Sequence, residues 1–141
     1  MKARIRFAIR CVLAASLLAC TAATRATQAG ETTQGWPYVS GGVSHEERAA
    51  LHAQGSGYSL WVVTAAMKSG AYLSDVRVMV RDAKQRVVFD GRLDGPWLFI
   101  DLPLGRYEVE AAFSGQARQR VTTIHRGDHH QALFYFDTGD H

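Results

Sequence analysis

Alternation of apolar and polar positions dominates the chain from Tyr58 onward. A period of two residues places successive side chains on opposite faces of a strand, and a short, wholly apolar run is typical of a buried strand. Seven such stretches are separated by polar turns: Tyr58–Ala66, Val76–Arg81, Val87–Phe89, Trp97–Leu102, Tyr107–Phe113, Arg118–Thr123 and Ala132–Phe136. Short strands at this regular spacing predict an all-β fold, a seven-stranded sandwich or barrel over residues 57–137.

A short helix is predicted directly before these strands. The stretch Ser44–Glu47 has the sequence SHEE, a capping box. In such a box the serine hydroxyl accepts from the glutamate amide, and the glutamate carboxylate reaches back to the serine. The predicted helix covers residues 43–56 and ends at Gly55.

Residues 30–42 are rich in Gly, Thr and Ser and have no period, so we expect them to form a flexible leader. Trp36 and Tyr38 are unusual in such a segment. They either dock on the domain or belong to a mobile arm.

The first 29 residues have the composition of a secretory signal peptide. A basic start is followed by the apolar run Cys11–Ala23 and by small residues. The run is too short to span a bilayer, which needs about 20 apolar residues. Cleavage after Ala29 is expected and would make Gly30 the mature start; cleavage after Ala26 is nearly as good. The signal predicts a periplasmic or secreted protein.

Removal of this segment changes the charge of the protein. The whole chain has 16 Lys and Arg against 13 Asp and Glu, a formal net charge of +3. Five of the basic residues precede Gly30, so the mature chain keeps 11 of them and has a net charge of −2. The basic footprint of a nucleic-acid-binding protein is therefore missing, and we exclude that function.

Both cysteines, Cys11 and Cys20, lie in the export segment, so the mature domain would contain neither a thiol nor a disulfide. The stretch Leu17–Cys20 resembles a bacterial lipoprotein box. In that alternative, a lipidated Cys20 would anchor the domain to a membrane surface.

The hairpin between the fifth and sixth predicted strands allows a register prediction. If Val109 and Val121 both face inward, a three-residue loop, Ser114–Gln116, places them opposite each other. Glu110 would then face Arg120 on the outside.

Three stretches resemble carboxypeptidase regulatory-like domains, which are bacterial modules with a prealbumin-like (transthyretin-like) sandwich. They are Ser69–Val76, the turn Asp94–Pro96, and Leu102–Val109 with its pattern L-P-x-G-x-Y-x-V. The resemblance covers about Tyr58 to Phe136 and implies seven strands, here preceded by one short N-terminal helix. Leu104 departs from the family where a second proline is frequent, and Gln85 departs where glycine is usual.

The resemblance implies no particular activity. The related hydroxyisourate hydrolases share the sandwich but end in a Tyr-Arg-Gly-Ser motif, which this chain lacks. No G-x-S-x-G elbow or phosphate-binding glycine loop is present. The aspartates near strand ends are more typical of turns than of a catalytic pair. We therefore expect no enzymatic activity and no cofactor.

One dense histidine cluster is a candidate metal site. His125, His129 and His130, with Asp128, offer ligands for zinc, copper or nickel if three or four of them converge. The alternative is a solvated turn, because Gly127 and Asp128 are typical turn residues.

Two aromatic residues are a candidate binding surface. Trp61 and Trp97 lie in predicted strands and are expected in the core. An exposed Trp97 beside Tyr72 would instead suit stacking on a sugar ring or a peptide. The predicted function is therefore a non-catalytic, exported binding or interaction module of the bacterial envelope with a protein or saccharide partner. A periplasmic metal-handling protein that uses the histidine turn is the alternative.

Overall fold

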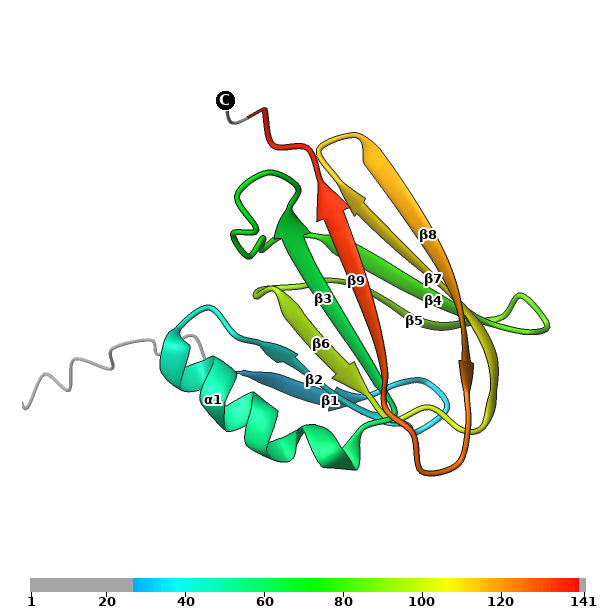
Figure 1. Ribbon diagram of the computed structural model, residues 1–141. Coiled ribbons are helices and arrows are strands. Elements are labelled where there is room, and N and C mark those ends of the chain that lie inside the picture. Colours follow the sequence, from blue (N-terminus) through cyan, green and yellow to red (C-terminus); the bar gives the residue numbers. More distant parts are fainter. Residues whose placement is uncertain (1–26, 140–141) are drawn as a thin grey trace, which may run out of the picture.

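The computed structural model describes residues 27–139 (Figure 1). These residues form nine strands, one α-helix and one short 3-10 helix. In chain order they are β1 (Gln28–Glu31), β2 (Pro37–Gly41), α1 (His45–Gln54), η1 (Gly55–Gly57), β3 (Leu60–Ala66), β4 (Arg77–Asp82), β5 (Val87–Arg92), β6 (Trp97–Ile100), β7 (Gly105–Phe113), β8 (Gln116–Ile124) and β9 (His130–Phe136). Within this part of the chain no helix is long and apolar enough to cross a membrane. Cys20 and most of the predicted export segment lie outside it.

The strands form two sheets that pack face to face. Sheet A has the order β1-β2-β6-β3-β9, and sheet B has the order β5-β4-β7-β8. Neighbouring strands are antiparallel except β3 and β9, which are parallel. The all-β, two-layer prediction is confirmed. The predicted number of strands is not, because β3 to β9 match the seven expected strands and two more precede them.

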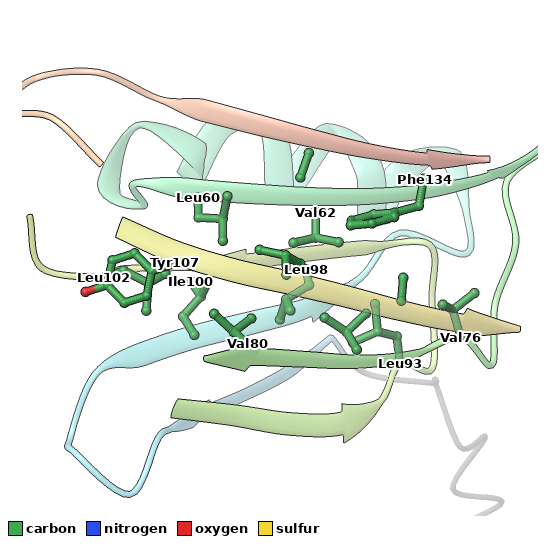
Figure 2. Close-up of a cluster of buried hydrophobic side chains, with 14 of the residues drawn as sticks. Leu60, Val62, Val76, Val80, Leu93, Leu98, Ile100, Leu102, Tyr107 and Phe134 are labelled. Carbon is green, nitrogen blue, oxygen red and sulfur yellow. The ribbon is translucent and has the colours of Figure 1, made fainter. Parts of the chain in front are cut away.

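The core lies between the sheets (Figure 2). Leu60 and Val62 of β3 and Leu98 of β6 face sheet B, and Val80 of β4 faces them from the other layer. These four side chains are fully buried. They are the inward positions of the period-two pattern, so hydrophobic burial holds the two layers together.

The prediction of a flexible leader over residues 30–42 is wrong. Strand β2 lies beside β6, with Val39 opposite Phe99, and β1 pairs with β2. Val39 is buried, and Trp36 packs against the core between the sheets. The sequence of β1, QAGE, shows no apolar alternation, and both faces of this strand are largely exposed. β1 is a strand because its backbone pairs with β2.

Helix α1 begins as predicted but lies between β2 and β3, so it does not precede the sandwich. The Ser44 hydroxyl accepts from the Glu47 amide at 3.1 Å. The Glu47 carboxylate reaches past Ser44 and accepts from the amides of Gly42 at 3.2 Å and Val43 at 3.0 Å. This arrangement still satisfies free amides before the first turn.

Gly55 does not end the helix in the left-handed conformation. Its φ is −59°, and the chain continues into η1. Glycine is needed there because a Cβ atom would lie 2.2 Å from the Trp61 ring. The helix covers the outer face of sheet A, where Leu51 packs with Val39 and Phe99 (Figure 1).

The predicted register of the β7–β8 hairpin is wrong by one residue. Glu110 lies opposite Gln119, and Val109 lies opposite Arg120. Ser114 and Gly115 have φ values of +48° and +77°, which are typical of a two-residue type I′ turn. The shorter loop moves Val121 to the outer face, where it is 56% exposed.

The L-P-x-G-x-Y stretch forms a corner before β7. Tyr107 is buried, and its hydroxyl donates to the carbonyl of Pro103 at 2.9 Å. Gly105 has a φ of +148°, which favours glycine. The tyrosine therefore fixes the turn as well as filling the core, a role that its sequence pattern alone did not indicate.

Candidate binding surfaces

The histidine-rich turn lies at one end of the sandwich. Together with the loops before β3 and β7 it lines an open groove of about 400 Å³. The groove is lined by polar side chains around an apolar floor, and its lining includes Tyr58, Asp101, Leu102, Leu104, Ile124, His125, Arg126, Asp128 and His129. A groove of this size is within the range of small-ligand sites.

Strand geometry separates the histidines that were predicted to converge. His130 pairs with Leu60, whose side chain faces the core, so His130 is on the inner side of sheet A. His129, one residue earlier, lies on the outer side. Its Nδ1 is 3.0 Å from the Tyr58 carbonyl oxygen, and its ring is 5.7 Å from that of Trp61. Adjacent residues at a strand end point to opposite faces, which is why the cluster divides.

The predicted metal site is therefore not assembled. His125 and His130 remain close, with ring centroids 5.8 Å apart, but Nε2 of His130 is buried without a hydrogen-bond partner. Across residues 27–139 no group of three or more His, Cys, Asp or Glu side chains is placed to hold a metal ion. His125, Asp128, His129 and His130 thus fit the alternative of a polar turn better than a ligand set.

A row of stacked aromatic rings lies on the outer face of sheet A. Trp97 and Phe99 of β6 stack with ring centroids 5.8 Å apart, and Phe99 stacks on Trp61 of β3 at 4.6 Å. α1 packs against this row through Leu51, which lies in the same buried cluster as the central ring, Phe99. The row is a second small core, which agrees with the expectation that Trp61 and Trp97 are mainly packing residues.

Tyr72 extends the aromatic row into solvent. It lies in the loop between β3 and β4 and meets Trp97 edge to face, with centroids 5.9 Å apart. Tyr72 is 48% exposed, whereas Trp97 is partly buried and its Nε1 has no hydrogen-bond partner. The structure thus brings together the two residues predicted as a binding surface, with Tyr72 as the accessible member.

Arg48 of α1 holds Tyr72 from the other side. Its guanidinium lies 5.1 Å from the centre of the Tyr72 ring. One Arg48 nitrogen, Nη1, donates to the carbonyls of Gly42 at 2.9 Å and Val43 at 3.0 Å. Because the arginine is fixed by two backbone carbonyls, it restricts the position of the ring that it covers.

Two further exposed residues belong to the same surface and were missed from the sequence. Ala65 of β3 forms a bridge with Tyr72 on one side and pairs with Tyr135 of β9 on the other. Paired residues share a face of the sheet, so both tyrosines flank the buried Ala65. Tyr135 is 41% exposed, and Met67, two residues beyond Ala65, is 54% exposed. We call the surface formed by Ala65, Met67, Tyr72 and Tyr135 the tyrosine shelf.

A signal for Tyr135 was present in the sequence. It alternates with Phe134 and Phe136, both of which are buried in the core. The alternation therefore predicts that Tyr135 faces outward. It does not show that Tyr135 and Tyr72 lie on either side of β3.

Sheet B presents a different outer face, formed by ion pairs. Arg77 donates two hydrogen bonds to the Asp90 carboxylate, at 3.0 and 2.9 Å, and these bonds lower the pKa of Asp90. Arg81 lies between Glu108 at 3.4 Å and Glu110 at 3.5 Å. Exposed pairs of this kind stabilise weakly and keep the face hydrated. The Asp90 carboxylate thus serves as the cross-strand partner of Arg77.

No protein-family model matches the chain, and no curated protein matches it.

Proposed function

We propose that this protein is a non-catalytic, exported binding module of the bacterial envelope that holds a protein partner on the tyrosine shelf. The observation that supports this most directly is the exposure of Tyr72, Tyr135 and Met67 together around the buried Ala65 on one face of sheet A. Exposed apolar side chains that gather on one face mark interaction sites more often than scattered ones do.

The chemistry of the shelf favours a protein over a saccharide. A sugar ring stacks on an open aromatic face, but the Arg48 guanidinium covers Tyr72 and Phe99 stacks on Trp97. Tyrosine, methionine and arginine are the residue types enriched at the centres of protein interfaces. The shelf has tyrosine and methionine, and Arg48 of α1 packs against it.

The resemblance to carboxypeptidase regulatory-like domains is part of this proposal. Two packed sheets and the Pro103–Tyr107 corner are consistent with it. Such a sandwich supports many functions, so the fold adds no substrate or activity. The proposed location rests on the basic and apolar composition of the first residues.

Site-specific crosslinking in living cells tests the proposal. A photoreactive phenylalanine analogue is placed at Tyr72 or Tyr135, and the matched control carries it at Val121, which is as exposed but lies on sheet B. We expect one discrete crosslinked protein from both shelf positions and none from the control. Equal crosslinking from Val121, or none from the shelf, contradicts the proposal.

Affinity measurements with the crosslinked partner complete the test. Truncation of an interface tyrosine costs about 2 kcal/mol, so Tyr72→Ser should weaken binding roughly 30-fold. Val121→Ser should leave the affinity unchanged. If Tyr72→Ser instead abolishes binding to an envelope polysaccharide and no protein is captured, the partner is a saccharide and the protein assignment is wrong.

A further inference from the structure

The first three described residues are built into the fold. Gln28 and Ala29 of β1 lie opposite Ser40 and Val39 of β2. Thr27 lies against Gly41, since a Cβ atom added to that glycine would be 3.4 Å from the Thr27 Cα and 3.5 Å from its Oγ1. Thr27, Gln28 and Ala29 therefore contact β2 directly.

Cleavage after Ala29 would remove half of β1. Only Gly30 and Glu31 would remain, which is shorter than the strands of globular proteins, usually three residues or more. Val39 and Ser40 are each only 3% exposed, and both would lose their partners on β1. β2 would become the outer strand of sheet A.

That cleavage would also place a charged amino group on a residue that packs against an aromatic ring. Gly30 lies opposite Tyr38, and the tyrosine ring covers it so closely that a Cβ atom on Gly30 would be 2.7 Å from the hydroxyl oxygen. The Tyr38 ring in turn packs edge to face on Phe89 at 5.1 Å. An ammonium group on Gly30 would lie next to this packed ring, and β2, with the sequence PYVSG, offers it no carboxylate partner.

The sequence itself allows two cleavage sites. Signal peptidases require small residues one and three positions before the cut. Thr27 and Ala29 meet this requirement for one site, and Thr24 and Ala26 meet it for the other. The local pattern does not choose between them.

We infer that the export machinery hydrolyses the Ala26–Thr27 bond, so that the mature protein begins at Thr27. Water adds across this peptide bond, which leaves a carboxylate on Ala26 and an amino group on Thr27. This inference rests on the proposed export, and it replaces the predicted cut after Ala29 with the one that keeps β1 whole.

Intact-mass measurement of the exported protein tests the inference. The full chain is expressed in a bacterium with a general secretion system, together with Ala26→Leu and its matched control Ala29→Leu. Leucine is too large for the position before the cut. Ala29 is exposed on the edge strand, so the control can still fold. We expect the natural chain and Ala29→Leu to begin at Thr27, and Ala26→Leu to lose that product.

Three outcomes would overturn the inference, and they differ in what else they affect. A natural chain that begins at Gly30, or processing blocked by Ala29→Leu alone, overturns the cleavage site and leaves export intact. A chain that begins at an acylated Cys20 overturns the site and shows a membrane anchor. An uncleaved chain retained in the cytoplasm overturns both this inference and the proposed export.

Discussion

Single residues in left-handed conformations mark the turns of this sandwich. Gln85 has a φ of +63°, at the position where the sequence lacks an expected glycine. The turn is held by Asp82, whose carboxylate accepts from the amides of Lys84 and Arg86 at 2.9 Å each. The aspartate thus stabilises a conformation that glutamine itself disfavours.

Gln85→Gly should therefore stabilise the protein. Removal of the side chain relieves the strain of a positive φ, and we expect a gain of about 0.5–1 kcal/mol in the free energy of unfolding. Urea denaturation measures it. The control is Lys84→Gly in the same turn, where φ is not positive, and it should destabilise by a similar amount. A loss of stability in both variants would contradict the prediction.

At the scale of elements, side chains close the gap between the outer strands β8 and β9. Arg120 donates through Nε to the Leu133 carbonyl at 2.7 Å, and its guanidinium lies 5.8 Å from the Phe134 ring. The Gln116 side chain donates to the Asp137 carbonyl at 2.7 Å and accepts from its amide at 3.2 Å. Side chains thereby occupy backbone groups in and directly after β9 that another strand would otherwise bind.

Arg120→Met should destabilise the protein by about 1–2 kcal/mol, because the Leu133 carbonyl loses its donor and Phe134 loses the cation above it. Thermal and urea unfolding measure the effect, and light scattering follows association through the uncovered edge. The control, Arg106→Met, removes the same charge from an exposed position on β7. It should change neither the free energy of unfolding nor the light scattering appreciably. Equal effects of the two substitutions would show that net charge, rather than the closed edge, is responsible.

At the scale of the whole molecule, the two outer faces differ in character. Sheet A has an aromatic row partly covered by α1, whereas sheet B has ion pairs across its strands. This asymmetry is what directs the proposed partner to sheet A.

Alkaline stability should depend on Tyr107. Burial raises the pKa of its hydroxyl above the ordinary value of 10.0, and the nearby Asp82 raises it further. The unfolded chain therefore loses this proton at a lower pH than the folded protein does. The contribution is complete below pH 10.0 and is lost as the pH rises through the folded pKa.

In the Tyr107→Phe variant, the free energy of unfolding should fall less steeply as the pH rises above 10.0. At pH 7 the variant should be less stable by about 1 kcal/mol, because the hydrogen bond to the Pro103 carbonyl is lost. The difference from the natural protein should shrink above pH 10.0. Urea unfolding across this range checks it, with the exposed Tyr135→Phe as control. A difference that stays constant with pH would contradict the assignment to Tyr107.

Much of the fold was predictable from local patterns, because the period of apolar residues decides which side of a strand is buried. Seven of the described strands were predicted in this way. The Ser44 cap was predicted from the capping-box motif, and Gln85 was identified through the family resemblance, as standing where glycine is usual. The candidate surface was predicted in part. Tyr72 and Trp97 were identified, but Tyr135 and Met67 were not.

Only the tertiary structure decided how these elements meet. The type I′ turn at Ser114 set the β7–β8 register, and alternation at the start of β9 separated His129 from His130. β2 became a strand because a ladder with β6 was available, and β1 because a ladder with β2 was, although their own sequences have little apolar pattern. The local sequence determines which face of a strand is buried. Which strands pair, and in which register, depends on segments that are distant in the sequence, and a local pattern carries no information about them.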